Sequence, residues 1–208
     1  MQKVNYQRQL DKIIGGLGGE VPSLLLHSCC APCSSYCIEY LSRYFSITVL
    51  YYNPNIYPEA EYEKRKSEQK RLIGEMKTKY PVKMLDCDFE SERFYETARG
   101  LEDCREGGER CFGCYRLRLE KTVREAKNNG FDYFTTTLTI SPLKNAQKIN
   151  EIGHELSEEF NVEWLPSDFK KKEGYKRSIE LSKVYNLYRQ DYCGCIFSQR
   201  DKKITDTV

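Results

Sequence analysis

The sequence has no long hydrophobic run, and none of its apolar stretches approaches the roughly 20 residues that a membrane-spanning helix needs. It also lacks a signal peptide, since residues 1–20 are polar and glycine-rich. Neither sign of charge dominates, because 33 lysines and arginines face 31 aspartates and glutamates. We therefore expect a cytoplasmic protein with no membrane partner, whose overall charge does not by itself demand nucleic acid.

Internal repeats, low-complexity tracts and linkers are also missing from the sequence. A chain of 208 residues is long enough for one domain with a sizeable core. We expect residues 1–208 to form a single catalytic domain, with an N-terminal extension over 1–20 and a C-terminal tail over 188–208.

Cysteine, by contrast, is abundant, with ten residues in the chain. In a cytosolic protein, clustered cysteines point to metal or redox chemistry rather than to a framework of structural disulfides. The cysteines form three groups, at 29, 30, 33 and 37, at 104, 111 and 114, and at 193 and 195, with Cys87 alone.

Two adjacent cysteines, Cys29 and Cys30, stand where a predicted strand turns into a predicted helix. Leu24–Leu26 are typical of a buried strand, and Pro32 fits the first turn of a helix, where its missing N–H costs nothing. Ligands of parallel α/β sheets bind at the carboxyl ends of strands, and a helix N-terminus favours thiolate over thiol. Because two touching thiolates repel, the pair calls for a metal ion or a disulfide.

The neighbours of this pair have plainer interpretations. Cys33 and Cys37 lie four residues apart on one helix face, so we favour packing in the core for both. His27 ends an apolar strand, which favours a hydrogen-bonded core residue over an acid or a ligand.

Strands alternate with helices along the chain, which predicts an α/β fold with a parallel sheet of about five strands and helices on both faces. The strands are expected at 23–27, 47–52, 82–85, 133–137 and 162–165, and the helices at 5–17, 32–45, 59–79, 90–99, 112–128, 145–159 and 174–187.

Cys111 and Cys114 open a predicted helix, and their spacing puts both thiols on one face of its first turn. Together with Cys29 and Cys30 they make a set of four cysteines that suits zinc or a [4Fe–4S] cluster. Adjacent cysteines reach two irons of a cluster more readily than they bind one tetrahedral ion, so the spacing favours the cluster. Cys104 is an alternate ligand, which we leave out of the set.

Cys193-Gly194-Cys195 in the tail has one residue between its cysteines, so any disulfide between them closes a strained, easily reduced ring. This suits a catalytic or regulatory dithiol, while metal ligation stays open as the alternative. Other polar candidates are Asp168, as a proton donor, ion ligand or helix cap, and the hydroxyls of Thr135–Thr139, which bind substrate or merely satisfy backbone.

Basic residues recur among tyrosines, of which there are 16, and this combination suits an unstacked nucleotide and its phosphates. Most such runs are solvated faces, so the signal is weak. The basic residues whose segments adjoin predicted strand ends are Lys64, Arg65, Lys170, Lys171 and Lys172.

Six ordered motifs carry a resemblance that spans about residues 24–198. They are HSCCAPC, YYNPNIYP, GGERCFGCYRLRL, TTLTISPLKN, LPSDFKKKEGY and YRQDYCGC. With these motifs the chain resembles the cobalamin-independent epoxyqueuosine reductases of the QueH type. The resemblance implies a Rossmann-like (HUP-like) fold, and reduction of epoxyqueuosine at the wobble position of tRNA with loss of the epoxide oxygen as water.

The resemblance also implies the parts of the site. Cys29, Cys30, Cys111 and Cys114 correspond to the ligands of a [4Fe–4S] cluster, and Cys193 and Cys195 to a redox-active disulfide. A second metal ion, iron, beside the cluster and an electron donor that the sequence does not identify are implied too. An alkoxide is a poor leaving group, so a Lewis acid or proton donor must weaken the epoxide C–O bond. The second metal, Asp168 and Tyr192 are the candidates.

Two other classes of protein stay open at this point. One is a zinc protein that binds RNA through its basic, tyrosine-rich surface without catalysis. The other is a metal-free thiol–disulfide oxidoreductase that uses Cys111 and Cys114 or Cys193 and Cys195. An ATP-using enzyme of the same fold lacks support, because no Ser-Gly-Gly-type phosphate loop follows the first predicted strand.

Overall fold

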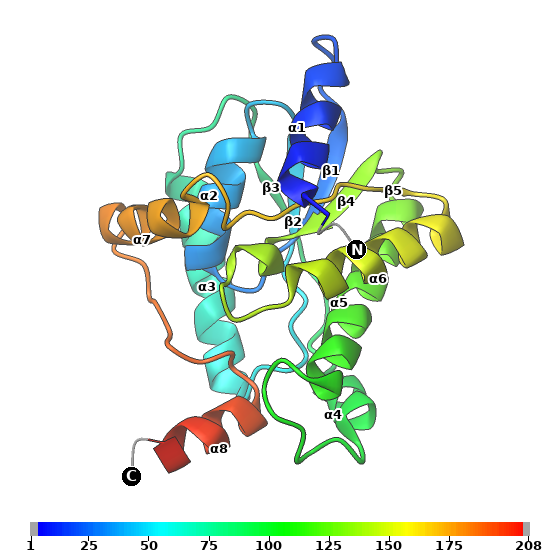
Figure 1. Cartoon of the computed structure of the whole chain (residues 1–208). Helices are drawn as coiled ribbons and strands as arrows, with labels where there is room; N and C mark the ends of the chain where they lie inside the picture. The colour runs from blue at the N-terminus through cyan, green and yellow to red at the C-terminus, as the bar shows by residue number, and fades with distance from the viewer. Residues whose placement is uncertain (1–3, 206–208) are drawn as a thin grey trace.

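The computed structural model describes residues 4–205 and is built around one five-stranded sheet (Figure 1). All neighbouring strands are parallel, in the spatial order β3-β2-β1-β4-β5. The expected α/β fold with a parallel sheet of about five strands is confirmed. The strands are β1 (Ser23–His27), β2 (Ser46–Leu50), β3 (Lys83–Leu85), β4 (Tyr133–Thr136) and β5 (Glu163–Trp164).

Helices alternate with these strands, and no helix of the described part is both long and apolar enough to cross a membrane. They are α1 (Tyr6–Gly16), α2 (Ala31–Leu41), α3 (Glu59–Glu75), α4 (Ser91–Ala98), α5 (Glu109–Asn128), the 3-10 helix η1 (Thr137–Ile140), α6 (Ala146–Phe160), α7 (Gly174–Val184) and α8 (Ile196–Thr205).

The central strand β1 divides the core between the two faces of the sheet. Side chains of a strand point alternately to opposite faces. Leu25 packs in the cluster that contains residues of α4, α5 and α6, whereas Leu24 and Leu26 pack in the cluster that contains residues of α1 and α2. All three leucines are fully buried. The expected covering of both faces by helices is therefore confirmed.

The order of the strands reverses at β1, which lies between β2 and β4. His27, the last residue of β1, is paired with Leu50 of β2 and with Thr136 of β4. Three strands therefore end at the same level, and such a reversal is where open α/β sheets bind ligands. The first cysteine pair follows β1 at this point, after the single residue Ser28.

The structure corrects several helix ends. The helices expected over 32–45, 59–79 and 174–187 end earlier, at Leu41, Glu75 and Val184. Helix α5 starts at Glu109 instead of residue 112, so Cys111 lies inside its first turn. The tail also contains a helix that the sequence reading did not predict, α8.

Candidate active site and metal centre

The pair Cys29 and Cys30 lies at the turn from β1 into α2, as expected. Cys30 is the extended residue that precedes the helix, and Pro32 lies in its first turn. The two sulfur atoms are 3.8 Å apart. The sulfur of Cys33 joins them, and all three sulfurs lie within 4.8 Å of one another. This triad is a metal-sized group of thiols.

Cys33 is the residue that the sequence interpretation undervalued. Cys37 is fully buried in the core, as expected. Cys33 also touches that core, but its sulfur belongs to the triad and lines a cavity. The signal was present in the spacing of Cys30 and Cys33, which are three apart at a helix start like Cys111 and Cys114.

The three thiols of the triad cannot all ionise in such close contact without a cation. Hydrogen bonds from Cys30 and Cys33 lower the pKa of Cys29 well below its usual value. The same contact with Cys29 raises the pKa of Cys30 to about 12 and the pKa of Cys33 well above its usual value. Thr137 of η1 also donates a hydrogen bond to the Cys29 sulfur, at 3.4 Å. A bound metal ion would remove this conflict.

Cys111 and Cys114 lie in the first turns of α5 and line a second, smaller cavity. The backbone N–H of Gly107 donates to the Cys111 sulfur at 3.2 Å. Burial raises the pKa of Cys114 to about 11. Neither sulfur belongs to the group that lies within 4.8 Å, so these two thiols stand apart from the triad.

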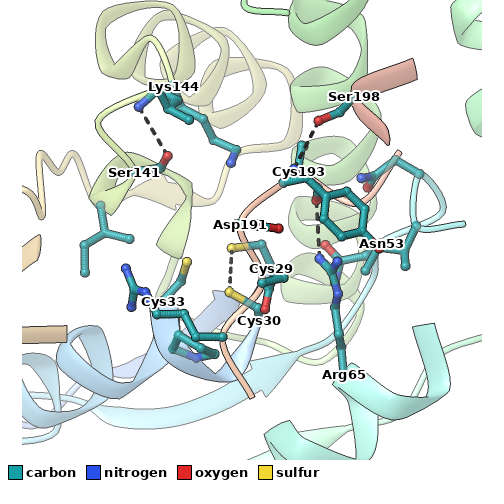
Figure 2. Close-up of a pocket in the computed structure, with 18 of the residues that line it drawn as sticks. Cys29, Cys30, Cys33, Asn53, Arg65, Ser141, Lys144, Asp191, Cys193 and Ser198 are labelled. Carbon is teal, nitrogen blue, oxygen red and sulfur yellow. Dashed lines mark hydrogen bonds between the residues drawn. The ribbon is translucent and has the colours of Figure 1, made fainter. Parts of the chain in front are cut away.

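The tail carries Cys193 and Cys195 to the same place. Residues that follow α7 run beside α3 toward α8 (Figure 1). Arg71 of α3 donates to the carbonyl of Tyr185, and Glu68 accepts from the backbone N–H of Tyr188. Arg65 of α3 donates to the carbonyl of Cys193 at 3.3 Å (Figure 2). Helix α3 thus fixes the position of the tail.

Cys193 lies between the two groups of thiols, because it lines both cavities. A hydrogen bond from Cys195 lowers the pKa of Cys193 well below its usual value, against the effect of burial and with help from Lys144 and Arg118. The same contact raises the pKa of Cys195 far above its usual value. In the structure both are free thiols, so the expected disulfide stays a prediction.

Two cations stand among these cysteines, the buried Arg118 and the half-buried Lys144, and the sequence analysis named neither. Burial opposes the charge of Arg118, yet Cys114, Cys193 and Cys29 raise its pKa. Burial opposes the charge of Lys144 too, and Cys193 and Cys29 raise its pKa. Figure 2 shows its side chain reaching into the cavity toward them. Arg118 follows Cys114 by one helical turn, so the sequence could have indicated that it lies beside this cysteine. Lys144 lies in a loop, and nothing in the sequence indicated its position.

The larger cavity, of about 760 Å³, opens beside the triad. Tyr192 lines it, as a residue of the site should. Asp168 does not line it, and its carboxylate forms an ion pair with Lys170. The structure therefore brings one of the two expected proton donors to the cavity and leaves the other outside.

His27 is a core residue, as favoured from the sequence. It is fully buried, with Nδ1 2.8 Å from the Thr136 hydroxyl and Nε2 2.9 Å from the Tyr52 carbonyl. Burial, with Arg118 as the next cause, lowers its pKa to about 3. The neutral ring joins the ends of β1 and β4, and it lies outside both cavity linings.

The threonines at the end of β4 and in η1 have different hydrogen-bond partners. Thr135 donates to the Leu165 carbonyl, and the Thr139 hydroxyl is 2.9 Å from the Ser167 hydroxyl. The hydroxyls of these two threonines therefore form hydrogen bonds within the protein rather than with the cysteines. Only Thr137 reaches the cysteines. Among the expected basic residues, Lys172 pairs with Asp11, and Arg65 is 2% exposed rather than solvated.

The fold and the site define a parallel α/β protein with a cysteine-rich pocket of the metal-binding or redox type. The chain matches the family Epoxyqueuosine reductase QueH over residues 24–201. It is 46% identical over 203 residues to the "Epoxyqueuosine reductase QueH" of Staphylococcus epidermidis, which covers 95% of this chain and 85% of the relative. The chain belongs to this family.

More distant relatives with the same name agree over most of their length. The Staphylococcus aureus protein is 43% identical over 209 residues, 98% of this chain and 87% of the relative. The Thermotoga maritima protein is 33% identical over 187 residues, 87% of this chain and 92% of the relative. The resemblance drawn from the six motifs is confirmed.

Proposed function

We propose that this protein is an epoxyqueuosine reductase that acts on tRNA. In the reaction, two electrons and two protons convert the epoxide to a carbon–carbon double bond and water. The relatives named above support the substrate. The observation that carries the proposal is the convergence of thiols from β1–α2, α5 and the tail on two adjoining cavities that share Cys193, Arg118 and Lys144.

The donor set fits a [4Fe–4S] cluster held by Cys29, Cys30, Cys111 and Cys114. A cluster with four thiolates is anionic, and the buried Arg118 and the half-buried Lys144 place two positive charges beside these thiols. The Nη2 atom of Arg118 is buried without a hydrogen-bond partner in the described part of the chain, as expected of a donor to such a group. When bound, the cluster would supply low-potential electrons.

The triad also suits a single metal ion. Metal–sulfur bonds of about 2.3 Å in tetrahedral geometry place two sulfurs roughly 3.8 Å apart, which is the separation of Cys29 and Cys30. Apart from the tail dithiol, Cys33 is the one cysteine of the two cavities that is not among the four proposed cluster ligands. We propose Cys33 as a donor to a second metal ion, iron, beside the cluster.

The tail dithiol suits the transfer of electrons in pairs. Oxidation of the Cys193 and Cys195 thiols to a disulfide releases two electrons and two protons, the amount that the epoxide takes up. Cys193 favours the thiolate and Cys195 retains its proton, the arrangement of an attacking and a resolving thiol. An external low-potential reductant must restore the dithiol after each turnover.

Tyr192 is the proton donor that we propose. It lines the larger cavity, and burial raises its pKa, so the phenol keeps its proton at neutral pH. Asp168 is the second candidate, and it would first have to leave its ion pair with Lys170. Comparison of Tyr192→Phe with Asp168→Asn in turnover separates the two assignments.

Metal and sulfide analysis separates this proposal from its rivals. Protein purified without oxygen should be brown and contain iron and acid-labile sulfide, and it should convert epoxyqueuosine in tRNA to queuosine. A colourless protein with zinc alone would favour the RNA-binding alternative. Full thiol–disulfide activity after metal removal, without epoxide reduction, would favour the metal-free oxidoreductase.

A further inference from the structure

Buried polar atoms without partners gather at the larger cavity. Among the residues that the structure describes, seven buried side-chain nitrogen or oxygen atoms have no hydrogen-bond partner. Native proteins pair nearly all such atoms, and an exception at a cavity indicates a ligand. Four of the seven belong to residues that line the larger cavity, namely Asn55, Arg65, Arg118 and Gln190.

These four residues form two pairs according to the cavities that they line. Asn55 and Arg118 also line the smaller cavity, so they stand between the two groups of cysteines. Arg65 and Gln190 line the larger cavity alone. The unpartnered Nη2 of Arg65 and Oε1 of Gln190 therefore belong to residues of the larger cavity, which the cysteine triad also lines.

Arg65 is held in place by its other contacts. Its Nε donates to Glu61 at 2.7 Å and its Nη1 donates to the Cys193 carbonyl at 3.3 Å. The guanidinium also lies over the ring of Tyr192, 5.2 Å from its centre. At Gly194, whose φ is +109°, a Cβ atom would lie only 2.8 Å from Nη1. With the side chain only 2% exposed, Nη2 is a fixed, desolvated donor.

Arg65 and Gln190 offer one donor and one acceptor, the complement of a ring carbonyl beside a ring N–H. The base of epoxyqueuosine, a 7-deazaguanine, presents this edge, as guanine does. A cavity of about 760 Å³ is within the range of roughly 300–1,000 Å³ that small-molecule sites occupy. A phosphodiester of the tRNA backbone would accept a hydrogen bond from Arg65 but has no proton to give Gln190.

We propose that Arg65 and Gln190 form the subsite that reads the base of the substrate. Arg65 Nη2 donates to the ring carbonyl and Gln190 Oε1 accepts from the ring N–H. This inference rests on the proposed function, whose substrate it takes as given. It assigns Arg65 a second role beside holding the Cys193 loop, so that base binding and the dithiol share one side chain.

The test is the affinity of the metal-loaded protein for queuosine nucleoside, measured by calorimetry, because this probe carries the base without a phosphate. We expect Gln190→Leu and Arg65→Lys each to weaken binding about tenfold or more. Gln190→Glu keeps an acceptor oxygen and should bind within about threefold of the wild type. The matched controls are Gln147→Leu and Arg124→Gln, since both residues are exposed side chains outside the cavity that pair with Glu151 and Glu120.

A salt series with tRNA separates a base contact from a phosphate contact. Loss of a phosphate contact lowers the slope of log affinity against log salt by roughly one, whereas loss of a base contact leaves that slope unchanged. We expect an unchanged slope for Arg65→Lys and Gln190→Leu.

Two results would overturn the subsite. One is wild-type nucleoside affinity in Gln190→Leu, and the other is an Arg65 effect that appears only in the salt slope. A wild-type protein that binds neither queuosine nucleoside nor epoxyqueuosine tRNA would instead contradict the proposed function itself. The two failures are therefore distinguishable.

Discussion

At the scale of the residue, the site places two cations among closely spaced thiols, whose thiolate forms would otherwise repel one another. Lys144 comes from the loop after η1 and Arg118 from the interior of α5, and both lie among cysteines that other segments supply. Positive charge lowers the pKa of a thiol, and it does so most strongly where water is excluded. We therefore expect each cation to lower the pKa of the neighbouring cysteines and so to increase the fraction of each that is ionised.

Replacement of Lys144 by Met tests this effect. The variant removes a charge that helps to lower the pKa of Cys193 and keeps a side chain of similar shape. We expect the pKa of Cys193 to rise, so the midpoint of its alkylation by iodoacetamide should move to higher pH, with a rate about tenfold slower per unit of pKa at pH values below both pKa values. Mass spectrometry across a pH series gives the profile. Lys148→Met, at a lysine that pairs with Glu151, is the control, and an unshifted profile in Lys144→Met would refute the effect.

The ligand set makes a second prediction at this scale. Cys29, Cys30, Cys111 and Cys114, each changed to Ala, should lose cluster iron and activity. Cys37→Ala is the matched control, because Cys37 is a fully buried cysteine of α2 in the core, and this variant should keep its iron. Iron and sulfide per chain are the measurement. Retention of four irons and four sulfides by all four variants would reject the ligand set.

The tail dithiol makes a third prediction. Cys193→Ser should keep the iron–sulfur absorption and lose most turnover with a physiological reductant, because the dithiol can no longer form a disulfide. Cys104→Ser, at a cysteine outside both cavity linings, should retain activity. Normal turnover of Cys193→Ser with that reductant would show that the dithiol has no part in the reaction.

At the scale of the element, several features of the site follow from the sequence. Strand β1 has the predicted ends, and the cysteine pair lies at the predicted turn into a helix. The alternation of strands and helices correctly gave a parallel sheet. Helix starts and ends are harder to predict from sequence because they depend on local caps. At Gly108, for example, the cap starts α5 three residues before the predicted start.

The features of the site that could not be predicted from the sequence are those that depend on burial by distant segments of the chain. Arg65 stands in the run Lys64–Lys66, which is typical of a solvated helix face, yet its side chain is 2% exposed because the tail folds over α3. Lys144 looks like any loop lysine. Helix α8 was missed because its sequence has few apolar residues to predict a buried face.

The contact between β1 and the start of β4 gives a prediction about stability. The Asp132 carboxylate accepts hydrogen bonds from the backbone N–H and the hydroxyl of Ser23, at 2.8 and 2.7 Å. These bonds lower the pKa of Asp132. The stabilisation is thus present above the unfolded-state pKa of about 3.9 and is lost as pH falls through the lower folded-state value.

Asp132→Asn should therefore lower the free energy of unfolding at neutral pH by about 0.5–1 kcal/mol, a small effect because the carboxylate is exposed and screened. The difference from the wild type should shrink toward zero as the pH falls through the lowered folded-state pKa of Asp132. Urea denaturation at several pH values is the measurement, with the exposed Asp103→Asn as control. A difference that persists unchanged in acid would exclude the charged hydrogen bonds as its source.

At the scale of the whole molecule, the fold assembles one centre from three distant parts of the chain. The reversal of strand order at β1 puts the first cysteines beside the end of β4, α5 brings the second group, and α3 fixes the returning tail. The central claim is that together they form one metal-dependent site that reduces epoxyqueuosine.

The most direct test is an anaerobic assay of the iron- and sulfide-reconstituted protein with epoxyqueuosine tRNA and a chemical reductant, with nucleosides measured by mass spectrometry. The account predicts conversion to queuosine with one water released per epoxide, and no conversion by the same protein after its metal is removed. Equal conversion by the metal-free protein, or no conversion by protein with a full complement of iron and sulfide, would contradict it.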